Sequence, residues 1–458
     1  MKVHFIAIGG SAMHNLAIAL SRKKVEVSGS DDEIFEPSRS RLEKEGILPP
    51  REGWYPEKIH EGLDAVVLGM HARADNPELK RARELNLKVY SYPEYVYRAT
   101  AGKQRIVIGG SHGKTSITGM LLHVLRDCGL SSDYLVGAQL EGYDCMVKLS
   151  EEAPRVVIEG DEYLSSVLDP RPKFHLYRPH IALISGIAWD HINVFPTFEN
   201  YLAQFETFIE LIEPNGHLVY YAGDGHLARL AAQSRPDITK HPYDTHPHRI
   251  EHNQSILQTD EGEWPIKVFG EHNLQNLSGA IQVLELMGLD KVDVYPSIAR
   301  FTGASKRLEL VTEAGAWSFY KDFAHAPSKL RATCSALKKQ FPERELIACM
   351  ELHTFSSLNK KFLPLYDGSM GSADKAMVYF NPEVLEHKRL EPLSPQEVQE
   401  AFGGSNVQVF TSTEALRSAL QALSWPGKNL LMMSSGNFGG IDFDALGAEI
   451  KASLPKPA

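Results

Sequence analysis

Short apolar runs alternate along the chain with stretches that have the periodicity of an α-helix. In the first quarter, strands are expected at Val3–Ile8, Val25–Ser28 and Asp64–Gly69. A helix is expected at Ala12–Arg22, directly after the first strand and its glycine pair. A second series of the same kind opens with a strand at Arg105–Gly109. Strands that alternate with helices are typical of α/β domains with mainly parallel sheets, which is the fold class predicted here.

A third series of strand-like runs occupies the last third of the chain, at Trp317–Tyr320, Leu346–Met350, Ala376–Phe380 and Leu430–Ser434. Each series opens its own pattern of strands and helices, so we predict three α/β domains. A chain of 458 residues suits that number, because a domain has roughly 100–200 residues. The predicted boundaries give domains 1–101, 102–303 and 304–458.

Composition narrows the classes of function. The chain has 58 acidic and 48 basic residues and a net charge of −10, which argues against a general nucleic-acid binder. No apolar stretch reaches the ~18 residues of a membrane span, and the first ten residues do not have the pattern of a signal peptide. The cysteines have no metal-site spacing and suit a reducing compartment: Cys128, Cys145, Cys334 and Cys349. We therefore expect a cytoplasmic protein without nucleic-acid or membrane partners.

The segment GGSHGKTS, residues 109–116, follows the strand at Arg105–Gly109 directly. Glycines let the backbone N–H groups of such a loop point at phosphate oxygens, and the next helix adds its positive N-terminal end. Lys114 can reach the β- and γ-phosphates, and the Thr115 hydroxyl can bind Mg²⁺. The strict motif has glycine where this chain has Ile108. The predicted phosphate-binding residues are Gly110, Ser111, His112, Gly113, Lys114, Thr115 and Ser116.

Acidic residues and a histidine follow two further predicted strands. Arg155–Glu159 ends in Glu159, and His180–Gly186 is followed shortly by Asp190 and His191. The carboxyl ends of parallel strands face the crevice where such sheets bind ligands, and carboxylate and imidazole groups hold divalent cations. The residues alone leave a solvated acidic loop and a structural histidine open as alternatives.

Two weaker motifs also suit a nucleotide. Asn273 and Asn276 lie three residues apart at the start of a helix expected to run to Leu286, and amide groups can pair with the edge of adenine. Taken alone, capping and a polar start of the helix explain the same residues better. The segments 9–13 and 28–31 form a degraded dinucleotide-binding pattern, which indicates a nucleotide-like ligand only weakly.

Taken in order, these segments resemble one family. The set IAIGGSAMHNLA, GGSHGKTS, EGDEY, WDH, GEHNLQN, GASKRLEL and KDFAHAP is similar to the Mur ligases, which build peptidoglycan precursors. The resemblance implies a Rossmann-like N-terminal domain, a central P-loop ATPase-like domain and a Rossmann-like C-terminal domain. It also implies ATP and Mg²⁺ as cofactors, and a monomer or weak homodimer.

Within the family, the chain is most like the members that join UDP-N-acetylmuramate to L-Ala-γ-D-Glu-meso-diaminopimelate in peptidoglycan recycling. The segments that favour this are DEY at 161–163, DPRPKFHLYRP at 169–179, DFAH at 322–325 and SSGNFGGI at 434–441. The alternative is the ligase that adds L-alanine in peptidoglycan biosynthesis. Either reaction forms the amide bond through an acyl phosphate made from ATP.

The resemblance implies a role for each motif residue. The catalytic set is Lys114, Glu159, His191, Arg307, Asp322 and His325. The metal ligands are Thr115, Glu159 and His191, and further ATP contacts come from Asn273, Asn276, Arg307 and Asp322. The UDP-sugar site is expected at Gly9, Gly10, Ser11, Met13, Ser30 and Asp31. The acceptor site, at the end of the strand Leu346–Met350, is expected at Glu351, His353, Ser356 and Asn359.

Some positions depart from the family pattern. Lys321 and Ala326 replace an aspartate and a histidine that relatives often have, and Gly160 replaces an alanine. Where some Mur ligases have a carbamylated lysine, this chain has Glu206, so we predict no carbamate. The acceptor segment also lacks the arginines of the alanine-adding members, which favours a longer and more polar acceptor.

Two other classes of protein explain less of the sequence. A nicotinamide-dependent oxidoreductase would account for the N-terminal glycines but would leave GGSHGKTS without a role. A nucleotide-binding regulator would account for GGSHGKTS but not for the carboxylate, histidine and arginine residues spread over three domains.

Overall fold

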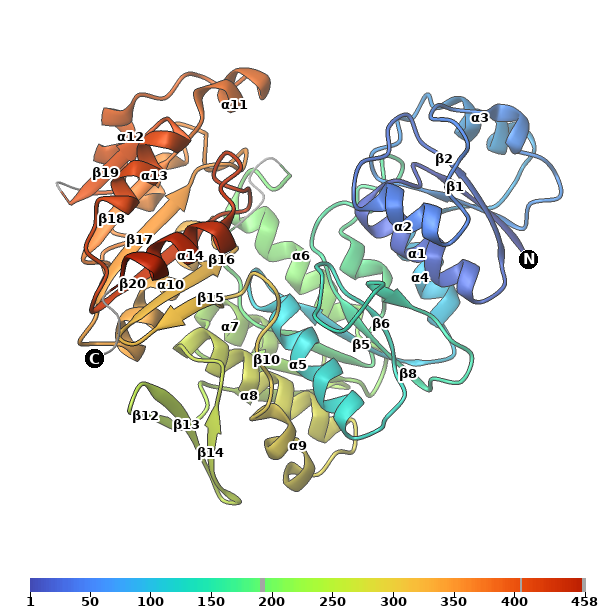
Figure 1. Ribbon diagram of the computed structural model, residues 1–458. Helices are drawn as coiled ribbons and strands as arrows, with labels where there is room; N and C mark the ends of the chain where they lie inside the picture. The colour runs from blue at the N-terminus through green and yellow to red at the C-terminus, as the bar shows by residue number, and fades with distance from the viewer. Residues whose placement is uncertain (190–193, 404–405, 455–458) are drawn as a thin grey trace. The chain divides into compact units, whose positions relative to one another are not determined.

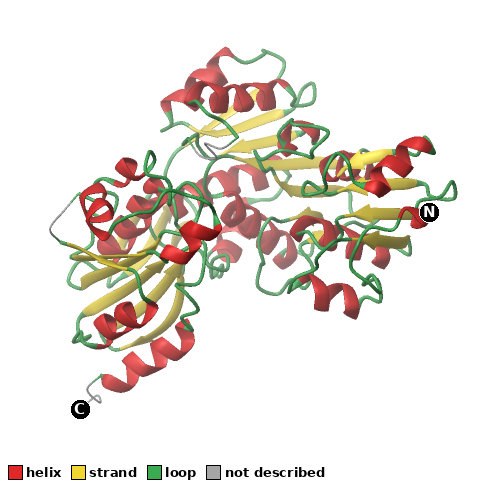
Figure 2. Ribbon diagram, turned by 90° about the horizontal axis from the view of Figure 1, so that it is seen from above, coloured by secondary structure: helices red, strands yellow, loops and turns green. Residues whose placement is uncertain are grey.

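The computed structural model describes residues 1–189, 194–403 and 406–454. The chain divides into two units that are described separately below. The first contains residues 1–189, 194–244 and 278–297, and the second contains residues 245–277 and the described residues from 298 onward. Parallel sheets flanked by helices occur in both units, as the sequence pattern predicts (Figures 1 and 2).

The first sheet of the first unit has four parallel strands. Their order is β2 (Glu26–Ser30), β1 (Lys2–Ile6), β3 (Ala65–Leu68) and β4 (Val89–Ser91). Helices follow the strands: α1 (Ser11–Arg22), α2 (Ser38–Lys44), α3 (Pro77–Glu84) and α4 (Tyr92–Thr100). Alternate side chains of the strands enter separate cores, since Phe5 and Val67 pack with the α1 side while Ile6 and Val66 pack with the α3 side. This burial of both faces explains why the two central strands, β1 and β3, are mainly apolar.

The first strand is shorter than the sequence predicts. We expected Val3–Ile8, but β1 ends at Ile6 because Ala7 has a left-handed φ of 67°. The N–H groups of Ala7 and Ile8 then both donate to the carbonyl oxygen of Ser30, at 2.9 and 3.1 Å. The apolar residues therefore continue past the strand into the turn that carries Gly9 and Gly10.

The second sheet of the first unit has seven strands. Their order is β11 (Thr239–Tyr243), β10 (His217–Tyr221), β9 (Ile181–Ile184), β5 (Gln104–Gly109), β8 (Arg155–Glu159), β6 (Asp133–Leu135) and β7 (Val147–Lys148). All neighbours are parallel except β6 and β7. In the register of the central strands, Ile108 lies opposite Glu159 and Gly109 lies opposite Ile184. The ends of β5, β8 and β9 therefore lie side by side, as the motifs require.

Three helices lie between strands of this sheet along the chain: α5 (Lys114–Asp127), α6 (Phe198–Glu210) and α7 (Gly225–Gln233). Two more, α8 (Glu271–Leu286) and α9 (Lys291–Ile298), come after its last strand in the chain, β11. The division between the two units falls inside α8, after Leu277. Ile108, which replaces the first glycine of the strict phosphate-loop motif, is fully buried inside β5.

A three-stranded antiparallel sheet in the second unit has no counterpart in the sequence-based prediction. It consists of β12 (His248–Glu251), β13 (Gln254–Thr259) and β14 (Gly262–Ile266). His252 and Asn253 form the first hairpin turn, with φ of 49° and 62°. Polar residues are common in these strands and few positions are buried, so the apolar periodicity that predicts a buried strand is weak in them.

The large sheet of the second unit has six strands in the order β15 (Glu309–Ala314), β16 (Trp317–Asp322), β20 (Lys428–Met433), β17 (Glu345–Glu351), β18 (Lys375–Tyr379) and β19 (Val407–Phe410). Only β15 is antiparallel to its neighbour. The helices are α10 (Pro327–Gln340), α11 (Pro382–His387), α12 (Pro395–Ala401), α13 (Thr413–Gln421) and α14 (Phe443–Ser453). Ala348 and Met350 enter the core with α10, whereas Ile347 and Cys349 enter the core with α13 and α14.

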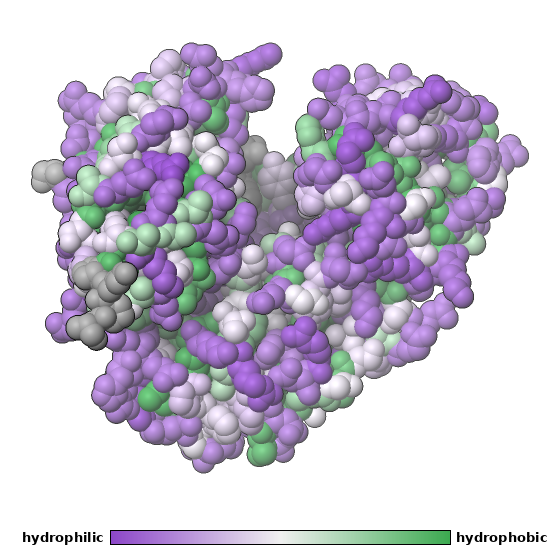
Figure 3. Space-filling view, in the orientation of Figure 1, coloured by the Kyte–Doolittle hydropathy of each residue, from purple (hydrophilic) through white to green (hydrophobic). Residues whose placement is uncertain are grey.

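Hydrophilic residues dominate the molecular face drawn in Figure 3, and hydrophobic residues appear there in small separate groups. Within the described part of the chain, none of the helices is long and apolar enough to cross a membrane.

Candidate active site

Two glycines shape the predicted phosphate loop. Gly110 has a φ of 122°, and a Cβ at this position would collide with the Ser185 side chain on the neighbouring strand end. Gly113 has a φ of 78° and is the N-cap of α5, so Lys114 is the first residue of that helix. The left-handed backbone at both positions favours glycine. The N-terminal end of α5 therefore faces the loop, which is the geometry of an anion site.

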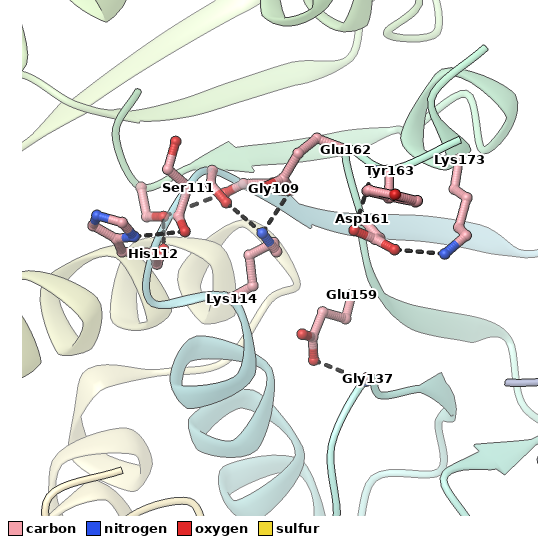
Figure 4. A network of polar contacts seen from close by, with 12 residues as sticks. Gly109, Ser111, His112, Lys114, Gly137, Glu159, Asp161, Glu162, Tyr163 and Lys173 are labelled. Carbon is pink, nitrogen blue, oxygen red and sulfur yellow. Dashed lines mark hydrogen bonds and ion pairs between the residues drawn. The ribbon is translucent and has the colours of Figure 1, made fainter. Parts of the chain in front are cut away.

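Lys114 is the cation of this loop. Its Nζ donates to the carbonyl oxygen of Gly110 at 2.7 Å and forms an ion pair with Glu162 Oε2 at 2.6 Å (Figure 4). Burial lowers the pKa of Lys114, but Glu162, Asp161 and Glu159 together more than compensate, so the pKa is raised. The lysine is therefore held as a cation between the loop and an acidic segment.

Thr115 and Glu159, the first two predicted metal ligands, are in contact. Thr115 Oγ1 donates to Glu159 Oε1 at 2.9 Å, and the N–H of Gly137 donates to Oε2 at 3.0 Å. A hydroxyl and a carboxylate are the hard oxygen ligands that Mg²⁺ prefers, and Mg²⁺ usually takes few protein ligands beside phosphate and water. The pair therefore fits the implied ion, although no group of three or more His, Cys, Asp or Glu side chains in the described residues is placed to hold a metal.

The other predicted loop residues support the backbone. Ser111 Oγ lies 2.8 Å from the hydroxyl of Tyr201 and accepts from the N–H of Ala188 at 2.9 Å. His112 Nδ1 lies 2.6 Å from the carbonyl oxygen of Ser111, and Ser116 is buried in α5. The third predicted metal ligand, His191, lies outside the described residues together with Asp190.

In the second unit, Asp322 holds the backbone on both sides of it. Oδ2 accepts from the N–H of Leu308 at 2.6 Å, and Oδ1 accepts from the N–H of Ala324 at 2.7 Å. Burial raises the pKa of Asp322, while Arg307, His272 and the two N–H groups act in the opposite direction. Both oxygens of this carboxylate are therefore used to fix the chain where β16 ends.

Arg307 lies between two residues with left-handed backbone. Lys306 has a φ of 56° and Leu308 has a φ of 48°, and the guanidinium lies over the ring of Phe323 with 4.7 Å between Cζ and the ring centroid. Such a conformation is strained for residues with a Cβ, so it persists only where surrounding contacts fix it. The bond from Leu308 to Asp322 is one of those contacts.

The two asparagines predicted to contact ATP are buried in the first turns of α8, and Asn273 Nδ2 donates to the carbonyl oxygen of Phe269 at 2.9 Å. Burial lowers the pKa of the neighbouring His272, with Asp322 and Glu271 opposing it.

His325 Nδ1 lies 2.9 Å from the carbonyl oxygen of Phe323. A cavity of about 160 Å³ separates the start of α8 from α10, with Gln275, Ser335 and Lys339 among its lining residues.

Lys321 and Ala326, the two residues near Asp322 that depart from the expected pattern, have local surroundings that suit them. Lys321 lies opposite Glu309 in the β15–β16 pair, and their side chains form an ion pair with 2.9 Å between Nζ and Oε1. Ala326 is buried at the N-cap of α10. The lysine at 321 therefore pairs with the neighbouring strand.

The predicted UDP-sugar residues gather at the carboxyl ends of β1 and β2. The N–H of Gly9 donates to Asp31 Oδ2 at 2.7 Å, and burial raises the pKa of Asp31 to about 6, more than the Gly9 bond lowers it. Lys58, which sequence reasoning missed, donates to Ser30 Oγ at 3.2 Å. Met13 is buried in α1, whereas Gly10 is partly exposed and Ser11 is exposed at its start.

The predicted acceptor residues follow β17. Glu351 is buried, and its Oε2 accepts from the N–H of Phe438 at 2.9 Å and from the hydroxyl of Ser434. His353 Nδ1 lies 3.8 Å from Glu351 Oε1. A Cβ on Gly436 would lie 2.7 Å from Glu351 Oε2, so this glycine lets the loop after β20 approach closely. Glu351 therefore joins the ends of two neighbouring strands.

Ser356 and Asn359, the other two acceptor predictions, lie in the turn beyond His353. The N–H of Asn359 donates to the carbonyl oxygen of Ser356 at 3.0 Å, and Asn359 Oδ1 accepts from the N–H of Lys361 at 2.9 Å. Both residues are partly exposed.

Sequence reasoning missed two residues of the phosphate-loop network. Glu162 was visible as the third residue after Glu159, but nothing in the motif distinguishes it from a solvated acid. Tyr201 gives no local signal at all, because it reaches the loop from α6. The predicted site residues also fall into separate units, with Lys114 in the first and Arg307 in the second.

Family comparisons cover nearly all of the chain. Residues 2–104 match the Mur ligase family catalytic domain, residues 108–284 match the Mur ligase middle domain, and residues 306–436 match the Mur ligase glutamate ligase domain. The chain belongs to the Mur ligase family. It is therefore an ATP-dependent ligase that forms an amide bond, with the three-domain α/β architecture of Mur ligases.

Individual Mur ligases are similar to this chain over most of their length. The UDP-N-acetylmuramate–L-alanyl-γ-D-glutamyl-meso-2,6-diaminoheptandioate ligase of Haemophilus influenzae is 28% identical over 454 residues, which is 96% of this chain and 97% of that protein. The UDP-N-acetylmuramate–L-alanine ligase of Limosilactobacillus reuteri is 30% identical over 390 residues, 82% of this chain and 84% of its own. The crystal structure of a murein peptide ligase from Psychrobacter arcticus covers 100% of both chains with a TM-score of 0.64 and 21% identity, which supports the fold.

Proposed function

We propose that this Mur ligase joins UDP-N-acetylmuramate to the tripeptide L-Ala-γ-D-Glu-meso-diaminopimelate, with hydrolysis of ATP, in the recycling of peptidoglycan. The observation that carries the proposal is the similarity to the Haemophilus influenzae ligase, whose name contains this donor and this peptide, over 96% of the chain. Because UDP-sugars and ATP are cytoplasmic metabolites, we place the reaction in the cytoplasm, with the enzyme as a monomer or weak homodimer.

The proposed reaction has two steps. The carboxylate of UDP-N-acetylmuramate attacks the γ-phosphate of ATP, which gives an acyl phosphate and ADP. The amine of the peptide then attacks the acyl carbon, forms the amide bond and expels phosphate. Phosphoryl transfer leaves little covalent work for protein groups, so the residues of the site act mainly by placing charge.

The phosphate loop supplies the groups that this first step needs. We assign Lys114 to the β- and γ-phosphates and the contacting pair Thr115 and Glu159 to one Mg²⁺. Bound there, Mg²⁺ would neutralise charge on the phosphates during transfer. The roles of His191 at a second metal, and of Asn273 and Arg307 at the nucleotide, remain proposals carried by the family resemblance.

The acceptor assignment depends on the ends of β17 and β20. The segments 351–361 and 434–441 contain serine, threonine and asparagine residues but no arginine. Compact recognition of one small amino acid favours a bidentate arginine at its carboxylate, whereas a long peptide can spread polar contacts along a groove. Of the two lysines at 351–361, Lys360 is paired with Glu397, with 2.7 Å between Nζ and Oε1.

The alternative acceptor is L-alanine. It is favoured by the L-alanine ligase of Limosilactobacillus reuteri, which has a slightly higher identity of 30% but covers 82% of the chain. The two reactions share the UDP-sugar, ATP and the acyl phosphate, so only the second step distinguishes them.

Release of ADP measured with each acceptor in turn tests the proposal. We expect kcat/KM for the tripeptide to exceed that for L-alanine by at least ~10², because polar groups built for a larger ligand stay unpaired with the smaller one. Equal or reversed preference would assign the chain to the L-alanine ligases. Absence of ADP release with both acceptors would contradict the ligase reaction itself.

A further inference from the structure

A directed chain of hydrogen bonds ends on the carboxylate of Glu162. The N–H of Ala188 donates to Ser111 Oγ at 2.9 Å, and Tyr201 OH donates to Glu162 Oε1 at 3.2 Å. Ser111 Oγ and Tyr201 OH lie 2.8 Å apart. Tyr201 has one proton, so the proton between the two hydroxyls must come from Ser111. Every donor in the chain therefore points towards the carboxylate.

The other oxygen of Glu162 is held by Lys114. Oε2 lies 2.6 Å from Nζ, and the exposed fractions of the two side chains are 1% for Glu162 and 15% for Lys114. Tyr201 is fully buried, with ring centroids 5.4 Å from Phe195 and 5.2 Å from Phe205. A buried charge is stable only when it is paired and hydrogen-bonded, and both conditions are met here.

This pairing has a consequence for a phosphate bound at the loop. The ammonium group of Lys114 has three N–H donors. One is bound to the carbonyl oxygen of Gly110 and a second to the carboxylate of Glu162. A phosphate that takes the third would share the lysine with a fixed carboxylate. Two anions a few ångströms apart in a poorly solvated place repel each other strongly.

We propose that Glu162 is a positioning residue that acts as an internal counter-anion of Lys114. It holds the ammonium in place while the loop is empty and opposes the phosphate charge when nucleotide enters. A divalent cation offsets that opposition, so Glu162 makes nucleotide binding depend on the metal. This inference rests on the proposed function, because it takes the ligand of the loop to be ATP.

Calorimetric titration with ATP in the absence of UDP-sugar and acceptor tests the role of Glu162, once with chelator and once with Mg²⁺. We expect Glu162→Gln to bind metal-free ATP at least about tenfold more tightly than the wild type, and to bind ATP with Mg²⁺ within about threefold of it. A purely structural role would weaken both affinities together. Equal or weaker binding of metal-free ATP by the variant would overturn the proposal.

A matched control is one residue away. Asp161→Asn removes the same charge, but Asp161 forms its ion pair with Lys173, with 2.6 Å between Nζ and Oδ2. We expect its metal-free affinity to change by less than about threefold, and a change as large as that of Glu162→Gln would overturn a specific role for Glu162. Should Glu162→Gln fail to fold, Glu162→Ser leaves space for water beside Lys114 and carries the same expectation.

The outcomes separate this inference from the proposed function. If the wild type binds ATP and Glu162→Gln matches it in both titrations, only the role of Glu162 is wrong. If the wild type binds no ATP with or without Mg²⁺, the proposed function fails and the inference fails with it.

Discussion

Glu159 and Asp322 are two carboxylates at predicted catalytic positions, and the structure holds them in different ways. Glu159 accepts from the side-chain hydroxyl of Thr115 and from one backbone N–H. Asp322 accepts from two backbone N–H groups, those of Leu308 and Ala324, which lie on either side of it in the folded chain.

This difference in partners determines which of the two carboxylates can exchange them. Glu159 and Thr115 can turn together towards a metal ion, because the bond between them joins two side chains and the one backbone N–H bound to Glu159, that of Gly137, belongs to no residue with left-handed backbone. Asp322 cannot leave its partners without freeing the strained segment around Arg307. Chemistry with exchangeable ligands is therefore expected at Glu159, and a positioning role is expected at Asp322.

The largest effect is expected at the phosphate loop, beside Glu159. Lys114→Ala should lower the rate of ligation by about 10²–10³, because it removes the cation that we assign to the β- and γ-phosphates. UDP-sugar binding, measured by titration, should stay within about threefold of the wild type, because its predicted site lies at the ends of β1 and β2. Retention of a tenth of the wild-type turnover would show that the phosphate-loop assignment is wrong.

The Mg²⁺ requirement of Glu159→Gln distinguishes the expected role of Glu159 from that of Asp322. The variant should need at least about tenfold more Mg²⁺ for half-maximal activity, because an amide is a weaker ligand than a carboxylate. Its midpoint of thermal unfolding should stay near that of the wild type, because no strained backbone depends on Glu159. An unchanged Mg²⁺ requirement would remove Glu159 from the metal site.

Asp322→Asn should show the opposite combination. The amide group leaves one of the two backbone N–H groups without an acceptor, which costs about 1–3 kcal/mol of unfolding free energy. Denaturant unfolding should detect this loss, and activity should fall while the Mg²⁺ requirement stays constant. A variant with normal stability and an altered Mg²⁺ requirement would place Asp322 with the metal ligands and contradict its positioning role.

The smallest effect is expected at Glu206, a third carboxylate, which is exposed on α6. Glu206→Gln should change kcat by less than about twofold, and added bicarbonate should not change the activity of the wild type. Intact-mass measurement checks the absence of a carbamate at the same time. Dependence on bicarbonate would contradict the prediction.

Local sequence patterns predicted the phosphate loop well. A strand, a glycine loop and a helix are adjacent along the chain, so their geometry follows from neighbouring residues. The sequence pattern also predicted that Glu159 lies near Thr115, because the parallel strands β5 and β8 bring their carboxyl ends to one edge of the sheet. The role of each residue in binding nucleotide or metal stays a prediction.

Other features depend on residues far apart in the sequence. Tyr201 contacts Ser111 across 90 positions, and no periodicity indicates such a contact. The β12–β14 sheet was not predicted because few positions in its strands are buried and apolar. The lysine at 321 departs from the family pattern, and only the strand pairing with Glu309 explains it.

A competition experiment tests the proposed reaction most directly. The enzyme receives ATP, equal amounts of L-alanine and L-Ala-γ-D-Glu-meso-diaminopimelate, and UDP-N-acetylmuramate with ¹⁸O in its carboxylate. Mass spectrometry should find the tripeptide product in at least about a hundredfold excess, and one ¹⁸O in the released phosphate, since the acyl phosphate passes its bridging oxygen to phosphate. A dominant L-alanine product would contradict the assigned acceptor, and phosphate without ¹⁸O would contradict activation of the carboxylate.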